Sequence, residues 1–350
     1  MNTDWLNFLK QHHANINNDQ VVGFSNATDE IEATTKHTII ADLSHFGLIR
    51  ASGEEAADFL QNQFTNDLKD VSPSQSQLTA YCSPKGRMLA SFRVFQFNDD
   101  YYLELSADIL EATLKRLRMF VLRSKVTLND VSNEWCRMGV AGDKASQLLA
   151  SQFSTVPAEN GQSVIEHDCV LIRLPGTHPG FEIHGTVNAL TSIWTSLEQN
   201  SKPVGKIAWD SLGTRAGIPV IQARTSEAFV PQMANFTAIG GVSFTKGCYP
   251  GQEVVARMRY LGKLKRRMYL AHIDTDTVPE PGDELFPSGN EETQSCGKIV
   301  QAQPAPGGGV NLLAVIQISA AEQEPSIHVG SPDGLALKLL DDPYPVTNKA

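Results

Sequence analysis

The residues best placed to do chemistry lie in one short segment, Lys246 to Glu253, which reads KGCYPGQE. Pro250-Gly251 is a turn signal, and neither Gly nor Pro follows until Gly262, which predicts a helix that begins near Gly251. Cys248 then precedes a helix N-terminus, whose partial positive charge favours a thiolate, and Lys246 adds a nearby cation. We therefore predict Cys248 as a working thiol and Lys246 as a second catalytic residue. The alternative is a small buried cysteine in a glycine-rich turn.

A cationic run follows this segment. Residues 257–267 contain six bases and no acid, whereas the whole chain has a net charge of −10. The bases are Arg257, Arg259, Lys263, Lys265, Arg266 and Arg267. The acidic remainder argues against a general nucleic-acid-binding protein, because such proteins neutralise many phosphates with bases. The run itself predicts a local face for an anion or an acidic partner.

The five cysteines are scattered, at positions 82, 136, 169, 248 and 296. This spacing includes no C-x-x-C pair, so we expect no metal site built from closely spaced cysteines. An odd, scattered count also favours a reducing cytoplasm over a secreted disulfide framework. The sequence contains no run of about 18 apolar residues, so we expect no membrane span. The N-terminus lacks the apolar core of a signal peptide, and residues 1–36 are expected to form a polar, partly helical leader.

The order of apolar patterns predicts an α+β protein of two or three domains. Strands are expected at residues 38–43, 88–97, 101–105, 170–174 and 181–184, and helices at 145–150 and 187–197. Short strands among Pro and Gly turns after residue 267 predict a small antiparallel barrel or sandwich. The expected domains are residues 1–133 plus 205–262, residues 134–204 as a ferredoxin-like α+β subdomain, and residues 263–350 as a C-terminal β-barrel.

Several segments together resemble the YgfZ / Iba57 family, folate-binding relatives of the glycine-cleavage aminomethyltransferase, or T-protein. The most specific is Gly240 to Arg267; the others are Asp42–Arg50, Phe59–Asp67, Ser83–Arg87, Gly217–Pro219 and Pro231-Gln232. The resemblance implies a three-lobed T-protein fold around a central folate hole. It also implies a link to iron–sulfur enzyme maintenance and to the modification of certain tRNAs.

The same resemblance points to three folate-binding residues. Phe46 and Trp209 occupy positions where the family places aromatic rings, and Glu182 lies where the T-protein has a carboxylate that reads the pterin edge. A carboxylate can accept two N–H hydrogen bonds from such an edge. The alternatives are plain core packing for the two rings and an exposed acid on a strand for Glu182.

One departure from the T-protein pattern concerns catalysis. The aminomethyltransferases carry an Asp in the strand that follows their equivalent of Lys85 to Arg87, whereas this chain has no acid from Met88 to Asn98. Ser91 is neutral and does not replace a carboxylate that steers a proton. Because the chain resembles this family but lacks the Asp, we expect an accessory factor and not an enzyme with its own turnover.

Three functions remain open on the sequence alone. The leading one is a folate-binding accessory factor that helps to assemble or repair iron–sulfur clusters in client enzymes, including tRNA-thiolating ones. Cys248 would then be a transient cluster ligand, a persulfide carrier or a reductant, and a partner would supply the other cluster ligands. The second is a tetrahydrofolate-dependent one-carbon transferase. The third is a direct tRNA-binding protein that uses residues 257–267.

Overall fold

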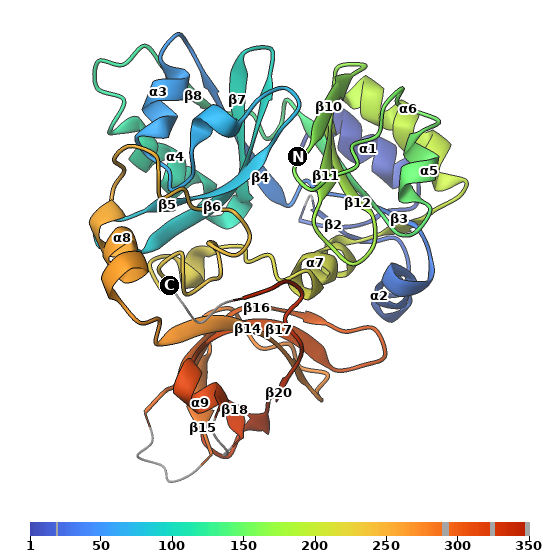
Figure 1. Cartoon of the computed structure of the whole chain (residues 1–350). Coiled ribbons are helices and arrows are strands. Elements are labelled where there is room, and N and C mark those ends of the chain that lie inside the picture. Colours follow the sequence, from blue (N-terminus) through green and yellow to red (C-terminus); the bar gives the residue numbers. More distant parts are fainter. Residues whose placement is uncertain (19, 289–293, 323–325, 347–350) are drawn as a thin grey trace. The chain divides into compact units, whose positions relative to one another are not determined.

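We describe the protein from a computed structural model that covers residues 1–18, 20–288, 294–322 and 326–346 (Figure 1). The chain divides into two compact units, which we describe separately. Unit 1 comprises Met1–Phe59, Lys69–Gln77 and Arg93–Leu212; unit 2 comprises Leu60–Leu68, Leu78–Phe92 and Gly213–Ala350. This grouping keeps residues 134–204 together with most of the N-terminal part, so the predicted three-domain division stays a prediction.

A six-stranded mixed sheet forms the centre of unit 1, in the strand order β10-β11-β12-β9-β3-β13. Its strands are β3 (Ile39–Asp42), β9 (Cys136–Ala141), β10 (Ser163–Glu166), β11 (Cys169–Leu174), β12 (Gly180–Gly185) and β13 (Lys202–Val204). Only β13 and β3 pair in parallel. The strands expected within 38–43, 170–174 and 181–184 are confirmed. Two strands of this sheet, β10 and β13, were not predicted, and β3 joins the sheet from outside residues 134–204.

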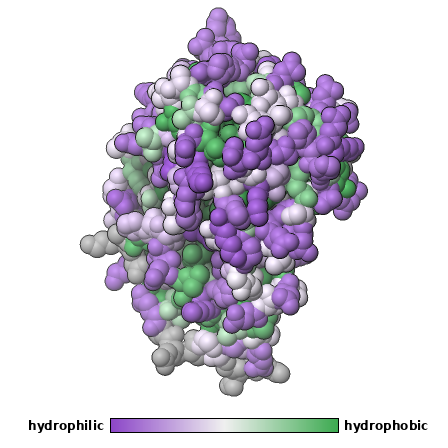
Figure 2. All heavy atoms as spheres, turned by 90° about the vertical axis from the view of Figure 1, so that its right-hand side faces the viewer, coloured by the Kyte–Doolittle hydropathy of each residue, from purple (hydrophilic) through white to green (hydrophobic). Residues whose placement is uncertain are grey.

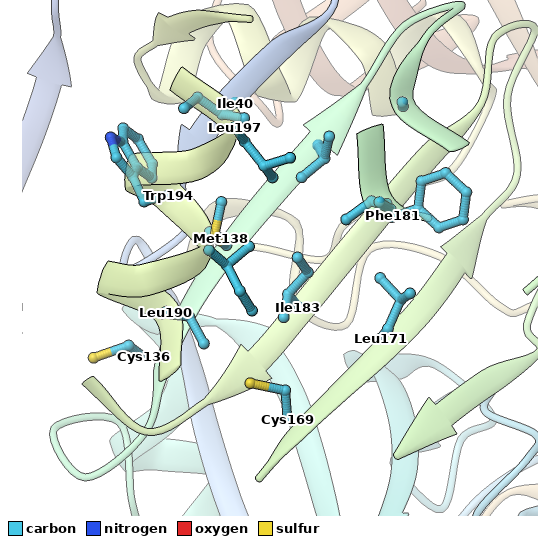
Figure 3. Close-up of a cluster of buried hydrophobic side chains, with 14 of the residues drawn as sticks. Ile40, Cys136, Met138, Cys169, Leu171, Phe181, Ile183, Leu190, Trp194 and Leu197 are labelled. Carbon is cyan, nitrogen blue, oxygen red and sulfur yellow. The ribbon is translucent and has the colours of Figure 1, made fainter. Parts of the chain in front are cut away.

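One face of this sheet is covered by two helices, α1 (Thr3–Gln11) and α6 (Val187–Glu198). Leu190, Trp194 and Leu197 recur at helical spacing along α6 and pack against Met138 and Ile183 of the sheet (Figure 3). Full burial of each such apolar side chain contributes about 1.5–3 kcal/mol. The apolar stripe of α6 thus explains why this segment folds as a helix against the sheet.

The N-terminal residues are partly helical, as expected, but they also contribute buried apolar side chains that the expected polar leader lacked. They form α1, the hairpin of β1 (Asn15–Asn17) and β2 (Gln20–Gly23), and α2 (Ala27–Lys36). Trp5 and Leu9 of α1 are completely buried, and the Trp5 Nε1–H donates to Asp42 Oδ1 at 2.7 Å. The leader was misjudged because its few apolar residues fall on one helix face, where a low average hydrophobicity conceals them.

The opposite face of the six-stranded sheet carries the polar residues of β9 and β12. Side chains alternate between the two faces of a strand, so Ile183 of β12 points to the helices while Glu182 and His184 point away from them. In the register, Glu182 pairs with Gly139, and His184 pairs with Arg137. Two cross-strand pairs at alternate positions, Glu182 with Gly139 and His184 with Arg137, therefore lie on one face.

A second sheet has the strand order β5-β6-β7-β4-β8. Its strands are β4 (Phe46–Ser52), β5 (Gln77–Cys82), β6 (Met88–Phe97), β7 (Asp100–Ser106) and β8 (Thr127–Asp130). The strands expected at 88–97 and 101–105 are confirmed. The connections between the strands of the two sheets contain short helices. These are α3 (Ala56–Gln61), η1 (Leu68–Asp70), η2 (Ala107–Ile109), α4 (Leu110–Arg118) and α5 (Ala145–Leu149). In unit 1, Glu104 of β7 pairs with Arg93 of β6 and with Leu48 of β4.

Unit 2 ends in a nearly closed antiparallel β-barrel, in the strand order β19-β18-β15-β16-β17-β14-β20 (Figure 1). Its strands are β14 (Arg266–Ile273), β15 (Glu284–Pro287), β16 (Gly297–Pro304), β17 (Val310–Gln317), β18 (Ile327–Val329), β19 (Leu335–Ala336) and β20 (Lys338–Leu339). The remaining helices among the described residues are α7 (Lys206–Arg215), η3 (Ala223–Thr225), α8 (Gln252–Leu261) and α9 (Ile318–Glu322). The predicted C-terminal barrel is confirmed, and α8 begins where the Pro-Gly turn predicts.

The surface is mainly polar where Figure 2 shows it, with apolar residues scattered among hydrophilic ones. Among the described helices, none is both long and apolar enough to cross a membrane.

Candidate functional site

The Trp209 side chain lies on the polar face of the six-stranded sheet. A Cβ atom on Gly139 would lie 2.3 Å from the Trp209 Cη2 atom, so the indole ring covers this glycine directly. Gly139 is the cross-strand partner of Glu182, and both residues face the same side of the sheet. The register therefore brings Trp209 and Glu182, 27 positions apart in the sequence, into neighbouring places.

Phe46, the first residue of β4, packs against the same apolar cluster as Trp209. Its side chain is half-buried, while Trp209 is buried at 5% exposure. The neighbouring His45 directs its Nε2 atom to Asp210 Oδ1 at 3.0 Å, and Lys206 forms an ion pair with the other carboxylate oxygen. Burial raises the pKa of Asp210, but these two basic neighbours outweigh it and bring the pKa to about 2. The three residues expected to bind folate thus occur together in unit 1.

Glu182 is buried, so the alternative of an exposed strand acid is wrong. The Arg93 Nε atom lies 2.9 Å from Glu182 Oε2, and both side chains are at most 10% exposed. Burial alone would raise the pKa of Glu182, but the Arg93 guanidinium and, to a smaller extent, His184 together outweigh it and hold the pKa below its ordinary value. Glu182 is therefore an ionised carboxylate that can accept hydrogen bonds.

Sequence reasoning missed the charged residues around Glu182. Glu104 Oε2 lies 3.7 Å from His184 Nε2, and Arg137 is almost completely buried beside them. Burial, together with the charge of Glu182, raises the pKa of Glu104 to about 8, and burial lowers the pKa of His184. A signal was present, because Glu104 interrupts the apolar run from Tyr101 to Leu105 and Arg93 the run from Phe92 to Phe95.

Glu104, Glu182 and His184 also form a geometrically compact set of metal-ligand types, with their ligand atoms within 4.8 Å of one another. Arg93 already pairs with the Glu182 carboxylate, however, and Glu104, with a pKa raised to about 8, is mainly uncharged at neutral pH beside the buried Arg137 cation. A divalent cation would add an uncompensated buried charge at this place, which is strongly unfavourable. The cluster is therefore better suited to a neutral ligand with hydrogen-bonding groups than to a metal ion.

Cys248 lies on the surface of unit 2, four residues before α8. The other four cysteines are buried, and burial raises the thiol pKa at each of them. Gly251 caps α8 with a φ of 81°, and a Cβ there would lie 2.4 Å from the Ser83 carbonyl oxygen. The thiol segment thus packs backbone to backbone against the turn that carries Lys85 to Arg87.

Lys246, which was predicted as a cation that supports the Cys248 thiolate, is a buried side chain. Its ammonium group donates to three carbonyl oxygens, those of Gln61 at 2.5 Å, Phe64 at 2.7 Å and Asn66 at 2.9 Å. Burial lowers the pKa of Lys246 to about 8, so it still carries its proton at neutral pH. Lys246 is therefore an internal anchor of the Cys248 segment, and its predicted catalytic role finds no support in this geometry.

The cationic face is largely exposed, with one exception. Arg257, Arg259, Lys263 and Lys265 are exposed, and Arg266 is half-buried. The Arg259 guanidinium lies 5.1 Å from the centre of the Phe244 ring. Arg267 differs, because it forms an ion pair with Asp342 at 2.9 Å and stacks over Tyr269. The Arg267 charge is thus balanced by Asp342 and is not part of the exposed cationic face.

The strand β6 carries no carboxylate along its whole length, from Met88 to Phe97. The Ser91 hydroxyl accepts a hydrogen bond from the Ile221 N–H at 3.0 Å. Ser91 therefore has a structural partner, in the strand where the resemblance implies an Asp in the aminomethyltransferases.

Proteins of known type resemble this chain over most of its length. The GCVT N-terminal domain family matches residues 8–242. A tRNA-modifying protein YgfZ from Colwellia psychrerythraea is 33% identical over 284 residues, which cover 81% of this chain and 87% of that protein. The chain belongs to the YgfZ family. A second YgfZ, from Hamiltonella defensa, is 31% identical over 78% of this chain and 82% of its own length.

The YgfZ-family chain also shares its fold with a solved structure. Aminomethyltransferase T of the glycine cleavage system from Bartonella henselae has a TM-score of 0.74 at 16% identity, covering 100% of this chain and 98% of that one. At this identity the likeness shows the fold alone. The predicted family and the T-protein-like mixed α and β fold are therefore confirmed.

Proposed function

We propose that this protein binds a reduced folate in unit 1 and supports the modification of tRNA by maintaining iron–sulfur client enzymes. The observation that carries the folate part is the placement of Trp209 over Gly139, the cross-strand partner of the ionised Glu182. An aromatic ring beside a buried carboxylate suits a flat heterocycle that carries N–H donors on one edge. The names of the YgfZ relatives support the link to tRNA.

In this proposal the folate supplies the planar pterin, and the residues of the chain bind and orient it. Glu182 accepts hydrogen bonds from the N–H groups of the pterin edge, and Arg93 keeps that carboxylate ionised and in place. Trp209 and the half-buried Phe46 supply apolar ring surfaces beside that edge. Burial of the carboxylate strengthens these hydrogen bonds relative to the same groups in water.

The proposed working group in unit 2 is the Cys248 thiol, because it is the one exposed thiol among the five cysteines, all of which the structure describes. As a transient ligand, its sulfur donates an electron pair to an iron atom of a cluster that a partner holds through its remaining ligands. The thiol proton passes to solvent, and no electron is transferred in this step. Arg257, Arg259, Lys263 and Lys265 would form the face towards an acidic partner.

Two experiments test the two parts of this proposal. Loss of a base–aromatic stack typically costs about 1–3 kcal/mol, so Trp209→Ala is expected to weaken reduced-folate binding roughly tenfold or more. Because Trp209 is buried, circular dichroism must show a folded variant, and Phe46→Ala provides a half-buried second test. Unchanged affinity in both folded variants would remove the rings from the site.

The thiol is tested in cells that lack their own YgfZ protein. Cys248→Ser is expected to abolish support of iron–sulfur-dependent tRNA thiolation, measured by mass spectrometry of tRNA nucleosides. Thr245→Ala, an exposed neighbour in the same segment, is the matched control and is expected to complement fully. Full complementation by Cys248→Ser would show that the thiol mechanism is wrong.

A further inference from the structure

Glu104 is a buried carboxyl group next to Glu182, and it has no role in the folate binding proposed above. It belongs to β7, and the ligand atoms of Glu104, Glu182 and His184 all lie within 4.8 Å of one another. All three side chains are nearly inaccessible to solvent. Two buried carboxyl groups this close cannot both be ionised without strong repulsion, unless other charges compensate each of them separately.

The surrounding charges compensate the two carboxyl groups unequally. Arg93 of β6 forms its ion pair with Glu182, at 2.9 Å. Arg137 of β9 makes its hydrogen bond to the carbonyl of Ser132, and its Nε and Nη1 atoms have no hydrogen-bond partner within the described chain. His184 of β12 stands 3.7 Å from Glu104, which is too far for a hydrogen bond.

This inequality separates the two groups in their protonation. The pKa of Glu182 lies below its ordinary value, whereas burial and the Glu182 charge raise the pKa of Glu104 to about 8. At neutral pH the pair therefore consists of one carboxylate and one carboxylic acid. Two carboxyl groups in different environments can serve in this way as acceptor and donor. The Glu104 Oε2 atom also lacks a hydrogen-bond partner among the described residues.

We propose that Glu104 determines ligand specificity by donating a hydrogen bond to the 4-oxo group of the pterin while Glu182 accepts from its N–H groups. This inference rests on the proposed folate function. The amide edge of a pterin places a carbonyl oxygen next to an N–H group, so a donor beside an acceptor is its complement. A 2,4-diaminopteridine carries an amino donor in place of that carbonyl, and it would set a donor against the Glu104 hydroxyl. A site that hydrogen-bonds one group rejects an analogue that lacks it.

The test compares two matched ligands by isothermal titration calorimetry. These are 5-formyltetrahydrofolate and its 4-amino-4-deoxy analogue, each titrated into the full chain between pH 6 and pH 9. We expect the wild type to prefer the 4-oxo ligand at pH 7. Its affinity is expected to fall about tenfold from pH 7 to pH 9, because the protonated fraction of a group with a pKa near 8 falls by that factor.

The variant Glu104→Gln keeps an amide donor but has no proton to lose. It is expected to bind the 4-oxo ligand without this pH dependence, and Glu111→Gln, an exposed acid on α4, is expected to behave as the wild type. The role of Glu104 would be overturned if the wild type bound both ligands equally and its affinity did not change over this pH range. That outcome would leave the proposed folate function standing. A wild type that binds neither ligand would instead contradict the proposed folate function. If Glu104→Gln does not fold, the two wild-type pH profiles decide the question.

Discussion

The indole ring of Trp209 covers Gly139 so closely that no side chain fits on this glycine. The contact links the apolar cluster of unit 1 to the polar face that carries Glu182, because Gly139 and Glu182 are cross-strand partners. A glycine at this position of a buried strand weakens the strand by itself. Glycine is nevertheless required at position 139, because a Cβ atom there would overlap the Trp209 ring.

The first prediction concerns this contact. Gly139→Ala should displace the Trp209 ring and lower the free energy of unfolding by about 1–3 kcal/mol, as overpacking of a buried site does. Reduced-folate affinity should fall as well. Gly213→Ala is the control, because a Cβ at Gly213 meets no atom within 4 Å. Urea unfolding of the two variants checks the prediction, and equal stability of both would show that the ring yields without strain.

The second prediction concerns the reactivity of the five thiols. Cys248 is exposed, whereas the remaining four are buried and burial raises their pKa values, for Cys136 and Cys169 to about 12. Iodoacetamide at pH 7.5 should therefore modify Cys248 first, as measured by peptide mass spectrometry. The native Cys248→Ser protein should take up no label on the same timescale. Labelling of a buried cysteine ahead of Cys248 would contradict the exposure that the thiol mechanism requires.

The third prediction tests Lys246 as an anchor. Lys246→Met removes the ammonium and leaves the carbonyls of Gln61, Phe64 and Asn66 without this donor, which should lower the free energy of unfolding by about 1–3 kcal/mol. Cys248 should become more reactive or less uniform in its reactivity, because its segment loses this support. Lys263→Met, at an exposed position, should leave stability within about 0.5 kcal/mol of the wild type. Equal stability of the two variants would refute the anchor.

The fourth prediction is that the protein does not transfer aminomethyl groups. The strand β6 has no carboxylate, and the Ser91 hydroxyl accepts a hydrogen bond from the Ile221 backbone N–H. A direct assay with a lipoylated carrier protein and tetrahydrofolate should therefore show no appreciable turnover. A rate above about 1 s⁻¹, a typical lower value for enzymes, would overturn this prediction.

The sequence predicted five strands of the two sheets in unit 1 and its border, β3, β6, β7, β11 and β12, and the helix after Cys248, because their periodicity and turn signals are local. The charged cluster around Glu182 escaped prediction for the opposite reason. Arg93 and Glu104 come from the paired strands β6 and β7, whereas Glu182 comes from β12 of the other sheet, so only the packing of the two sheets shows that these side chains lie together. The anchoring of Lys246 was equally hidden, since its three carbonyl partners lie about 180 residues earlier in the chain.

The central claim is that unit 1 binds a reduced folate through the ionised Glu182. Its most direct test is calorimetric titration of tetrahydrofolate, under anaerobic conditions, into the wild type, Glu182→Gln and the exposed-site control Glu111→Gln. The wild type and the control should bind with equal affinity and a stoichiometry of about one, since the proposal has a single site. Glu182→Gln should lose at least about tenfold, because the amide replaces a charged acceptor of the pterin edge. No binding by the wild type, or equal binding by a folded Glu182→Gln protein, would contradict the account.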